Sequence, residues 1–432
     1  MNSTATATSV QRYVVDATWQ RFAHTVVAGS PLAVFVTTAA AQFTLDALEG
    51  SAPLTLSRGQ RRLVDRLLDA GAIHPITAAG VGPSRREVTV VTPQLGGRVR
   101  TDGRITVDDG SSIPLAGAQL RLPSNRGPAA ARNAGRTLVT TPFVAFLDAD
   151  VTAPPEWIEP LLAHFADPTV GAVAPRVRGE QGSPLDLGNE PARIRSGTRV
   201  SYVPAAALVV RCAAFDAVGG FDDSLRVGED VDLLWRLDEA GWRCRYEPTS
   251  AVWHQPRSNA RKTLAQEADY GSSGAPLALR HPGALAPART NVWSAATAAL
   301  AVAGQPVAAA VVATGSSLAL APRLPQLPAR AAISMALRGH VASIRNLADA
   351  AWRTWWPIVT LGALVSRRGR WLVVATLLVR PHRRSIARDV AYGWGVWRGV
   401  RTHRTLQPLL PRLQAFPGRG SSPRSSAATL RS

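Results

Sequence analysis

The sequence predicts an α/β protein built around an open sheet, flanked by a small N-terminal unit and a helical C-terminal region. Short apolar runs alternate with segments of helical spacing. One run, residues 143–147, ends in two carboxylates, Asp148 and Asp150, and two prolines follow. In open α/β sheets, ligands bind beyond the carboxyl ends of the strands. The acidic pair therefore predicts a site at that edge.

The composition is basic and fits several domains. A chain of 432 residues can bury more than one core. The formal net charge is +19, and Lys262 is the one lysine among 49 basic residues. No basic-aromatic motif for nucleic acid is visible, which argues against a nucleic-acid partner. The arginines thicken toward the C-terminus beside apolar stretches, which favours an anionic membrane surface.

The two cysteines, Cys212 and Cys244, lack the spacing of a metal site. Residues 1–11 do not have the charged and apolar parts of a secretory signal. We therefore expect a cell-membrane protein whose catalytic domain faces the cytoplasm and has no structural disulfides.

Residues 11–77 predict a small winged-helix-like unit. Residues 30–37 have strand composition, whereas residues 39–48 and 59–70 have helical spacing. No group of catalytic side chains appears there. A Gly- and Pro-containing linker then leads into an α/β domain over residues 85–258.

The first strands of this domain are expected at residues 87–93 and 104–109. The second ends in Asp108 and Asp109, followed by a Gly-Ser turn. Carboxylates at a strand end suit hydrogen bonds to a ribose or base, although a solvated Asp-Gly turn has the same sequence. A helix beginning near Pro128 carries Arg132, which either faces phosphates or fixes the acidic loop.

Strand alternation predicts that Asp148 and Asp150 point the same way, which is costly unless a cation lies between them. Oxygen ligands suit Mg²⁺ or Mn²⁺, which also bind substrate phosphates. The alternative is that Asp150 caps the following helix or starts a turn.

A second acidic group lies at Glu229, Asp230 and Asp232, in the first turn of a predicted helix. The helix dipole explains acids at this position, and it also holds a carboxylate ionised and ready to accept a proton. His254 ends the domain, where a histidine is either structural or a metal ligand.

The C-terminal region, residues 270–410, is predicted to be helical and membrane-associated. Residues 290–322 carry no charge and are long enough to cross a bilayer, but glycines interrupt them. A broken span, a re-entrant hairpin and a helical pair stay open. Two shorter apolar stretches, residues 355–365 and 371–379, flank an arginine-rich turn and suggest an interfacial position. The tail, residues 417–432, is expected to be disordered.

Several motifs occur in one order along the chain, and together they resemble family-2 glycosyltransferases with the GT-A fold, which binds nucleotide-diphosphosugars. They are the Asp-Asp-Gly-Ser at Asp108, Gly127-Pro-Ala-Ala-Ala-Arg-Asn-Ala-Gly, Leu147-Asp-Ala-Asp, Gly219-Gly-Phe-Asp and Gly228-Glu-Asp-Val-Asp-Leu. Further stretches, among them Tyr202-Val-Pro-Ala-Ala-Ala, Tyr270-Gly-Ser-Ser and Trp355-Trp-Pro, resemble the glycosyltransferases of the mycofactocin system.

This resemblance implies an inverting transfer of glucose, from UDP-glucose, onto the peptide-derived cofactor mycofactocin or its precursor, building a short β-linked glucan. It implies that Asp109, with Asp108, contacts the nucleoside and that Arg132 and Asp148 lie in the nucleotide-sugar site. It further implies that Asp150, Asp148 and His254 hold the metal. The base is then Asp230 or, second, Glu229.

One departure concerns the ten residues between Pro93 and Arg104, because a parallel crossover normally needs a dozen or more. Either a short irregular connection closes the sheet, or the first strand is displaced and activity is weak. The abridged first half motivates one alternative, a catalytically weak nucleotide-sugar-binding scaffold. Because the sequence does not fix the acceptor, a second alternative is a transferase for a polysaccharide or lipid acceptor. A third is a membrane-interaction protein whose α/β region is vestigial. A further hypothesis is that the N-terminal unit binds the peptide precursor.

Overall fold

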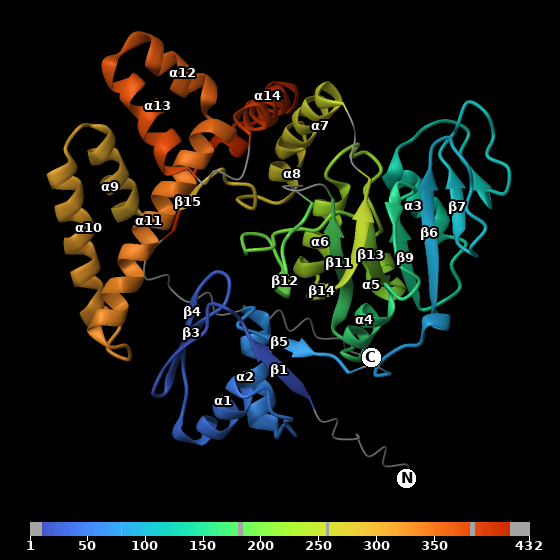
Figure 1. Ribbon diagram of the computed structural model, residues 1–432, viewed down its shortest axis with the longest axis horizontal. Coiled ribbons are helices and arrows are strands. Elements are labelled where there is room, and N and C mark those ends of the chain that lie inside the picture. Colours follow the sequence, from blue (N-terminus) through green and yellow to red (C-terminus); the bar gives the residue numbers. More distant parts are fainter. Residues whose placement is uncertain (1–10, 79, 180–184, 256–258, 381–384, 415–432) are drawn as a thin grey trace, which may run out of the picture. The chain divides into compact units, whose positions relative to one another are not determined.

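The computed structural model describes residues 11–78, 80–179, 185–255, 259–380 and 385–414 (Figure 1). The chain forms two compact units, residues 1–260 and 261–432. The tail that was predicted to be disordered lies outside the described residues.

The first unit begins with a small module of strands and two helices. An antiparallel pair, β1 with β5, accompanies a three-stranded sheet of order β2-β3-β4. Helix α2 starts at a capping box of Ser57 and Gln60 and buries Leu67 and Leu68, as the helical spacing predicts. The winged-helix assignment itself stays a prediction. The elements are β1 (Arg12–Val15), β2 (Gln20–Phe22), β3 (Thr25–Ala28), β4 (Ala33–Val36), α1 (Gln42–Glu49), α2 (Arg58–Asp69) and β5 (Ile73–Ile76).

The rest of the first unit is a mixed nine-stranded sheet of order β10-β14-β11-β13-β9-β6-β7-β8, in which β12 also pairs with β14. The strands β6, β7, β8, β9, β11 and β14 run parallel to one another, and β13 runs against its neighbours. Their bounds are β6 (Val88–Gln94), β7 (Ile105–Asp108), β8 (Leu120–Arg121), β9 (Phe143–Leu147), β10 (Val151–Thr152), β11 (Val170–Arg178), β12 (Ala192–Ile194), β13 (Ala207–Arg211) and β14 (Arg243–His254).

Both faces of this sheet are buried, because successive side chains of β9 enter opposite cores. Val144 and Phe146 join the core that α3 and α6 cover, whereas Ala145 and Leu147 join the core under α4. Gly135 allows α3 to approach β6, since a Cβ there would lie 2.4 Å from Val91 Cγ1. The helices are α3 (Pro128–Arg136), α4 (Glu159–Leu162), α5 (Cys212–Ala217) and α6 (Glu229–Glu239).

The short connection after β6 closes the sheet without a helix. Strand β7 pairs in parallel with β6, from Val91 with Ile105 to Gln94 with Asp108. The intervening loop turns at Gly96 and Gly97, which both have positive φ. Of the two outcomes that the sequence left open, the irregular connection is the one found, and the first strand, β6, is not displaced, because it pairs with both β7 and β9.

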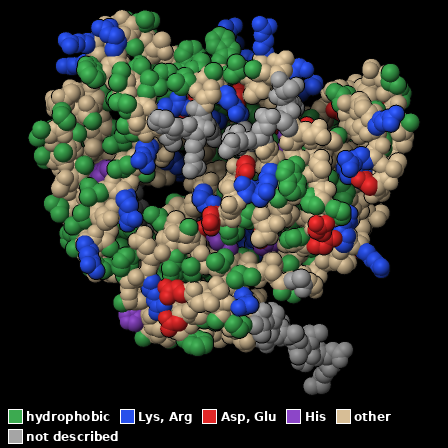
Figure 2. Space-filling view, in the orientation of Figure 1, with side chains coloured by type: hydrophobic (Ala, Val, Ile, Leu, Met, Phe, Trp, Pro, Cys, Tyr) green, Lys and Arg blue, Asp and Glu red, His purple; other side chains and the backbone are tan. Residues whose placement is uncertain are grey.

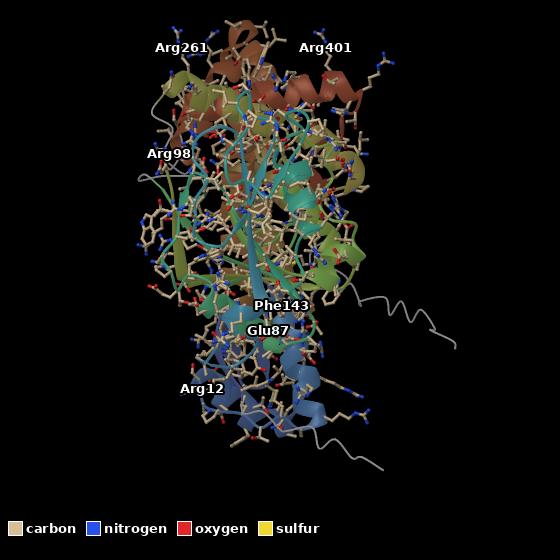
Figure 3. The ribbon with its side chains drawn as sticks, turned by 90° about the vertical axis from the view of Figure 1, so that its right-hand side faces the viewer. Arg12, Glu87, Arg98, Phe143, Arg261 and Arg401 are labelled. Atoms are coloured by element: carbon tan, nitrogen blue, oxygen red, sulfur yellow. The ribbon has the colours of Figure 1, made fainter. Side chains whose placement is uncertain are left out.

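The carboxyl ends of the parallel strands define one edge of the domain. Figure 3 shows Arg98, which follows β6, far along the domain from Glu87 and Phe143, which stand at the starts of β6 and β9. All the predicted site residues except those of α6 follow the carboxyl ends of strands or lie on the helix between them.

The second unit is helical, apart from the short parallel pair β15 (Arg289–Thr290) and β16 (Arg412–Leu413). Most of the uncharged residues 290–322 lie in two helices, α9 and α10, which are separated near Gly304. Within the described residues, no helix has both the length and the apolar character needed to span a bilayer. The helices are α7 (Ala260–Ser272), α8 (Gly274–Arg280), α9 (Val292–Val302), α10 (Pro306–Leu320), α11 (Ala329–Arg353), α12 (Trp356–Val365), α13 (Arg367–Val379) and α14 (Ile386–His403).

Candidate active site

The acidic pair lies on a turn between β9 and β10, not on a strand. Strand β9 ends at Leu147, and the backbone N–H of Val151 donates to the carbonyl of Asp148 at 3.1 Å. The prediction that strand alternation aims both carboxylates the same way is therefore corrected. Because the chain turns within three residues, each carboxylate meets a different partner.

Arg132 is the partner of Asp148. Its guanidinium, on α3, donates to Asp148 Oδ1 at 2.6 Å and to Glu229 Oε1 at 3.0 Å, and it is almost fully buried. Of the two positions that the sequence allowed, fixing the acidic groups is the one observed. The guanidinium has a raised pKa because both carboxylates, with Asp148 the larger influence, outweigh the effect of burial. One arginine thus joins the ends of β9 and α6.

The acidic residues of α6 lie in its first turn, directly after the N-cap residue Gly228. Gly228 has φ +86°, a left-handed conformation that glycine adopts without strain. Glu229 is buried and Asp230 is half-buried. Burial, followed by the charge of Asp230, raises the pKa of Glu229 to about 7. Burial also raises the pKa of Asp230. A carboxylate of raised pKa is a stronger base near neutral pH.

A loop before β13 holds Asp230 and Asp148 on the same side of the sheet. Ala205 N–H donates to Asp230 Oδ2 at 3.3 Å, and Asp148 N–H donates to the carbonyl of Ala206 at 2.9 Å. Trp235 on α6 fixes the same loop by donating to the carbonyl of Ser201 at 2.7 Å. These links bring together the metal motif and the candidate base, which lie about eighty residues apart in the sequence.

Asp108 and Asp109 are both buried, and both shape the neighbouring loops. Asp108 accepts hydrogen bonds from Ser111 N–H, Leu115 N–H and Arg121. Asp109 accepts from the N–H groups of Arg126 and Gly127, at 2.8 and 2.9 Å, just before α3. Their oxygens therefore order the loops beside the carboxyl edge. Their predicted contact with a nucleoside stays a prediction.

Asp150, the second carboxylate of the acidic turn, contacts His254 at the end of β14. Val151 pairs with His254 across β10 and β14, and His254 Nε2 lies 3.4 Å from Asp150 Oδ2. Within the described residues, no three acidic, histidine or cysteine side chains converge as a complete metal site. Carboxylate and imidazole donors on an accessible turn still suit a divalent ion that takes further ligands from substrate phosphates.

Several residues of this site were missed by reasoning from the sequence. The hydrogen bond from the backbone N–H of Ala205 to Asp230 could not be predicted, because every residue type except proline has such a donor. Arg121 pairs with Asp108 at 2.9 Å and resembles any other arginine of this arginine-rich chain. Of the two arginines Arg121 and Arg132, only Arg132 was identified from the sequence, because it lies in a motif.

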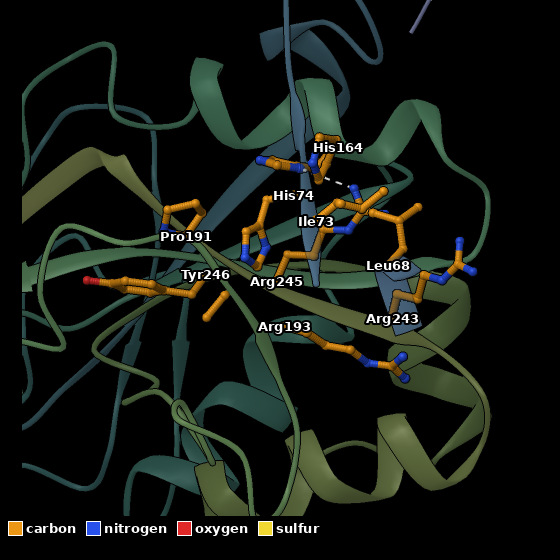
Figure 4. A pocket seen from close by; sticks show the side chains of 11 residues that line it. Leu68, Ile73, His74, His164, Pro191, Arg193, Arg243, Arg245 and Tyr246 are labelled. Atoms are coloured by element: carbon orange, nitrogen blue, oxygen red, sulfur yellow. Dashed lines mark hydrogen bonds between the residues drawn. The ribbon is translucent and has the colours of Figure 1, made fainter. Parts of the chain in front are cut away.

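A second cluster of charge lies at the amino ends of β11 and β14, where α2 and β5 meet the sheet. A cavity of 20 Å³, which has room for about one water molecule, is lined by His74, His164, Arg193, Arg243 and Arg245 (Figure 4). His164 Nε2 donates to the carboxylate of Glu247 at 2.8 Å, and His74 pairs with Asp16 at 3.0 Å. These residues compensate one another and bind the small module to the sheet.

Comparisons with known proteins identify the class to which this fold and site belong. The family model described as "Glycosyl transferase family 2" matches residues 118–209, which include Arg132, Asp148 and Asp150. The protein is therefore a family-2 glycosyltransferase, a transferase with a GT-A-like mixed α/β sheet. The chain is 39% identical over 407 residues to the pre-mycofactocin glycosyltransferase of Mycobacterium tuberculosis strain H37Rv, across 81% of this chain and 86% of that protein. It belongs to the pre-mycofactocin glycosyltransferase family.

More distant proteins match parts of the chain. The N-acetylglucosaminyl-diphospho-decaprenol L-rhamnosyltransferase of M. tuberculosis is 30% identical over 173 residues, across 33% of this chain and 56% of that protein. The mannosyltransferase PcManGT of Pyrobaculum calidifontis, solved with GDP-Man and Mn²⁺, is 17% identical, with a TM-score of 0.39 over 77% of this chain and 93% of that one. The family assignment rests on the sequence relatives.

Proposed function

We propose that this enzyme transfers glucose from UDP-glucose to mycofactocin or its precursor, with inversion at the anomeric carbon, and so builds a short β-linked glucan. Its family supports the acceptor, because the M. tuberculosis relative is named for pre-mycofactocin. One observation carries the proposal: Arg132 joins Asp148 of the acidic turn to Glu229, which precedes Asp230 on α6. Donor-binding and proton-accepting groups then share one edge.

Asp230 is the proposed base. It takes a proton from an acceptor hydroxyl while that oxygen forms a bond to the anomeric carbon and the bond from this carbon to UDP breaks. A single displacement of this kind inverts the anomeric carbon and needs no enzyme nucleophile. The backbone N–H groups of Ala205 and Val231 fix the Asp230 carboxylate. Glu229 is the second choice, because it is buried against Arg132.

Asp150 and His254, with Asp148 beside them, are the residues proposed to hold Mg²⁺ or Mn²⁺. When bound, such an ion offsets the negative charge that gathers on the departing diphosphate. Arg132 contributes by orienting Asp148, because its buried guanidinium donates to Asp148 Oδ1 at 2.6 Å.

The test is transfer of radiolabelled glucose from UDP-glucose to purified mycofactocin precursor in the presence of Mn²⁺. We expect Asp230→Asn to lower kcat by roughly 10²–10⁴-fold and to leave the affinity for UDP unchanged. Asp150→Ala should weaken UDP binding in Mn²⁺ but not in EDTA. Asp238→Asn, on the same helix but paired with Arg193, is the matched control and should keep wild-type turnover.

The outcomes separate the alternatives. UDP binding without transfer to any glycosyl acceptor would favour the nucleotide-sugar-binding scaffold. Transfer to a polysaccharide or lipid, and none to the peptide-derived cofactor, would refute the proposed acceptor. Wild-type kcat in Asp230→Asn would refute the assigned base.

A further inference from the structure

The helical hairpin formed by α12 and α13 exposes an unusual amount of apolar surface. No residue of α12 is buried, and Thr376 is the one buried residue of α13. The exposed large apolar side chains recur at helical spacing on each helix: Ile358, Leu361, Leu364 and Val365 on α12, and Trp371, Val374, Leu378 and Val379 on α13. These eight residues are termed here the hairpin surface. Such a patch on a folded unit marks an interaction site.

Positive charge borders this surface. The first turn of α13 carries Arg367, Arg368 and Arg370, all exposed, and residues 356–379 contain no Asp or Glu. In Figure 2 the part of the molecule that holds α12 and α13 shows apolar side chains together with Lys and Arg side chains. An apolar face bordered by cations and free of acids complements a surface that is both apolar and anionic.

The hairpin is a preformed element. Its helices cross closely at two glycines, since a Cβ on Gly369 would lie only 2.0 Å from the carbonyl oxygen of Gly362. The inner side of α13 is anchored, because Trp352 of α11 donates to the hydroxyl of Thr376 at 3.0 Å. The exposed apolar residues are therefore held outward by packing and do not depend on a partner for their arrangement.

We propose that the hairpin surface docks on an anionic lipid bilayer, with both helices lying in the plane of the headgroups. In that position the apolar side chains enter the acyl boundary while the three arginines extend to lipid phosphates. A second copy of the chain is a poorer occupant, because the arginine turns of two hairpins would meet with like charge. This inference does not depend on the proposed sugar transfer, and it assigns the predicted membrane association to a particular element.

The test is flotation of the full chain with vesicles of phosphatidylglycerol and phosphatidylcholine, compared with phosphatidylcholine alone. We expect wild type to float with the anionic vesicles. Leu364→Glu should lower the partition at least about tenfold, because it removes one leucine from the acyl boundary. Replacing Arg367, Arg368 and Arg370 together by Gln should lower it by roughly fivefold per arginine on anionic vesicles and leave neutral vesicles unaffected.

The matched control is Phe43→Glu. Phe43 is 72% exposed and Leu364 is 75% exposed, but Phe43 lies in the N-terminal module. This variant should float like wild type, and circular dichroism should show that all variants are folded. Equal flotation of Leu364→Glu and Phe43→Glu would overturn the proposal. It would also be overturned if wild type ignored vesicles while Leu364→Glu turned a dimer into a monomer in size-exclusion chromatography.

Discussion

Two clusters of charge lie at opposite ends of the same sheet, and they are compensated differently. At the amino ends of β11 and β14, four carboxylates each lie within 3.2 Å of an arginine; these are Asp65, Asp69, Asp167 and Asp238, paired with Arg193, Arg195, Arg243 and Arg245. At the carboxyl ends, Arg132 faces Asp148 and Glu229, and Asp230 is held by backbone N–H groups.

The pKa values follow this difference. Burial alone would raise the pKa of Asp167, but hydrogen bonds from Thr169 and the charge of Arg245 lower it. At the other end, burial raises the pKa of both Glu229 and Asp230 despite Arg132. Carboxylates that are each paired with an arginine, like Asp167, stabilise the fold. Carboxylates that share one arginine, like Glu229, keep an affinity for protons or cations, and a catalytic site uses that affinity.

The largest expected effect comes from removing the cation of the carboxyl-end cluster. Arg132→Met leaves Asp148 and Glu229 without the guanidinium that bridges them, which should cost about 3–5 kcal/mol in the free energy of unfolding. Urea denaturation measures it. Arg136→Met, on the same helix but paired with the exposed Asp216, should cost less than about 1 kcal/mol. Equal costs would show that the buried bridge through Arg132 contributes no more than an exposed ion pair.

Next comes the pH dependence of catalysis. A base works only when ionised; burial raises the pKa of Asp230, and the pKa of its neighbour Glu229 is raised to about 7. We therefore expect kcat/KM to fall with decreasing pH, and the fall to begin at a higher pH than an ordinary aspartate side chain would give. Profiles of wild type and Glu229→Gln would be compared. If the fall begins only below pH 5 in wild type, the carboxyl-end cluster is not under-compensated.

A smaller effect is expected from the pair of Asp16 and His74. Burial alone would raise the pKa of Asp16, but hydrogen bonds from His74 and Thr18 lower it to about 2. A lowered acid pKa stabilises the fold fully above the unfolded value near 4, and this stability is lost as pH falls toward 2. We expect about 2 kcal/mol of acid-dependent stability that Asp16→Asn removes. Thermal unfolding between pH 2 and 6 measures it. An unchanged acid slope in that variant would contradict the assignment.

The smallest effect is expected from Arg243→Met in the second cluster. Its partners Asp65 and Asp69 are half-exposed, so water and neighbouring arginines replace much of the lost attraction. A loss of about 1 kcal/mol is expected, with unchanged kcat. Glucose transfer measured beside urea denaturation checks both. A fall in kcat would mean that the two clusters are coupled through the sheet.

Much of the fold was predictable from local pattern. The apolar run before Asp148 forms β9, and the spacing before Gly71 forms α2. The motif order led to the family that the sequence relatives show. The turn at the acidic pair was only the alternative to a strand, because an apolar run does not reveal the residue at which a strand leaves the sheet.

The sequence by itself determined which residues carry charge, where helices and strands form, and in which order the motifs occur, because these depend on neighbours a few residues away. Only the tertiary structure decided which acids share a cation. Arg132 reaches Glu229 across 97 residues of sequence, and Ala205 reaches Asp230 across 25. Such pairs depend on sheet order and on the close packing of α3, which no local pattern encodes. The motifs therefore determine which chemical groups the candidate site contains, and the fold determines which of those charges pair with one another.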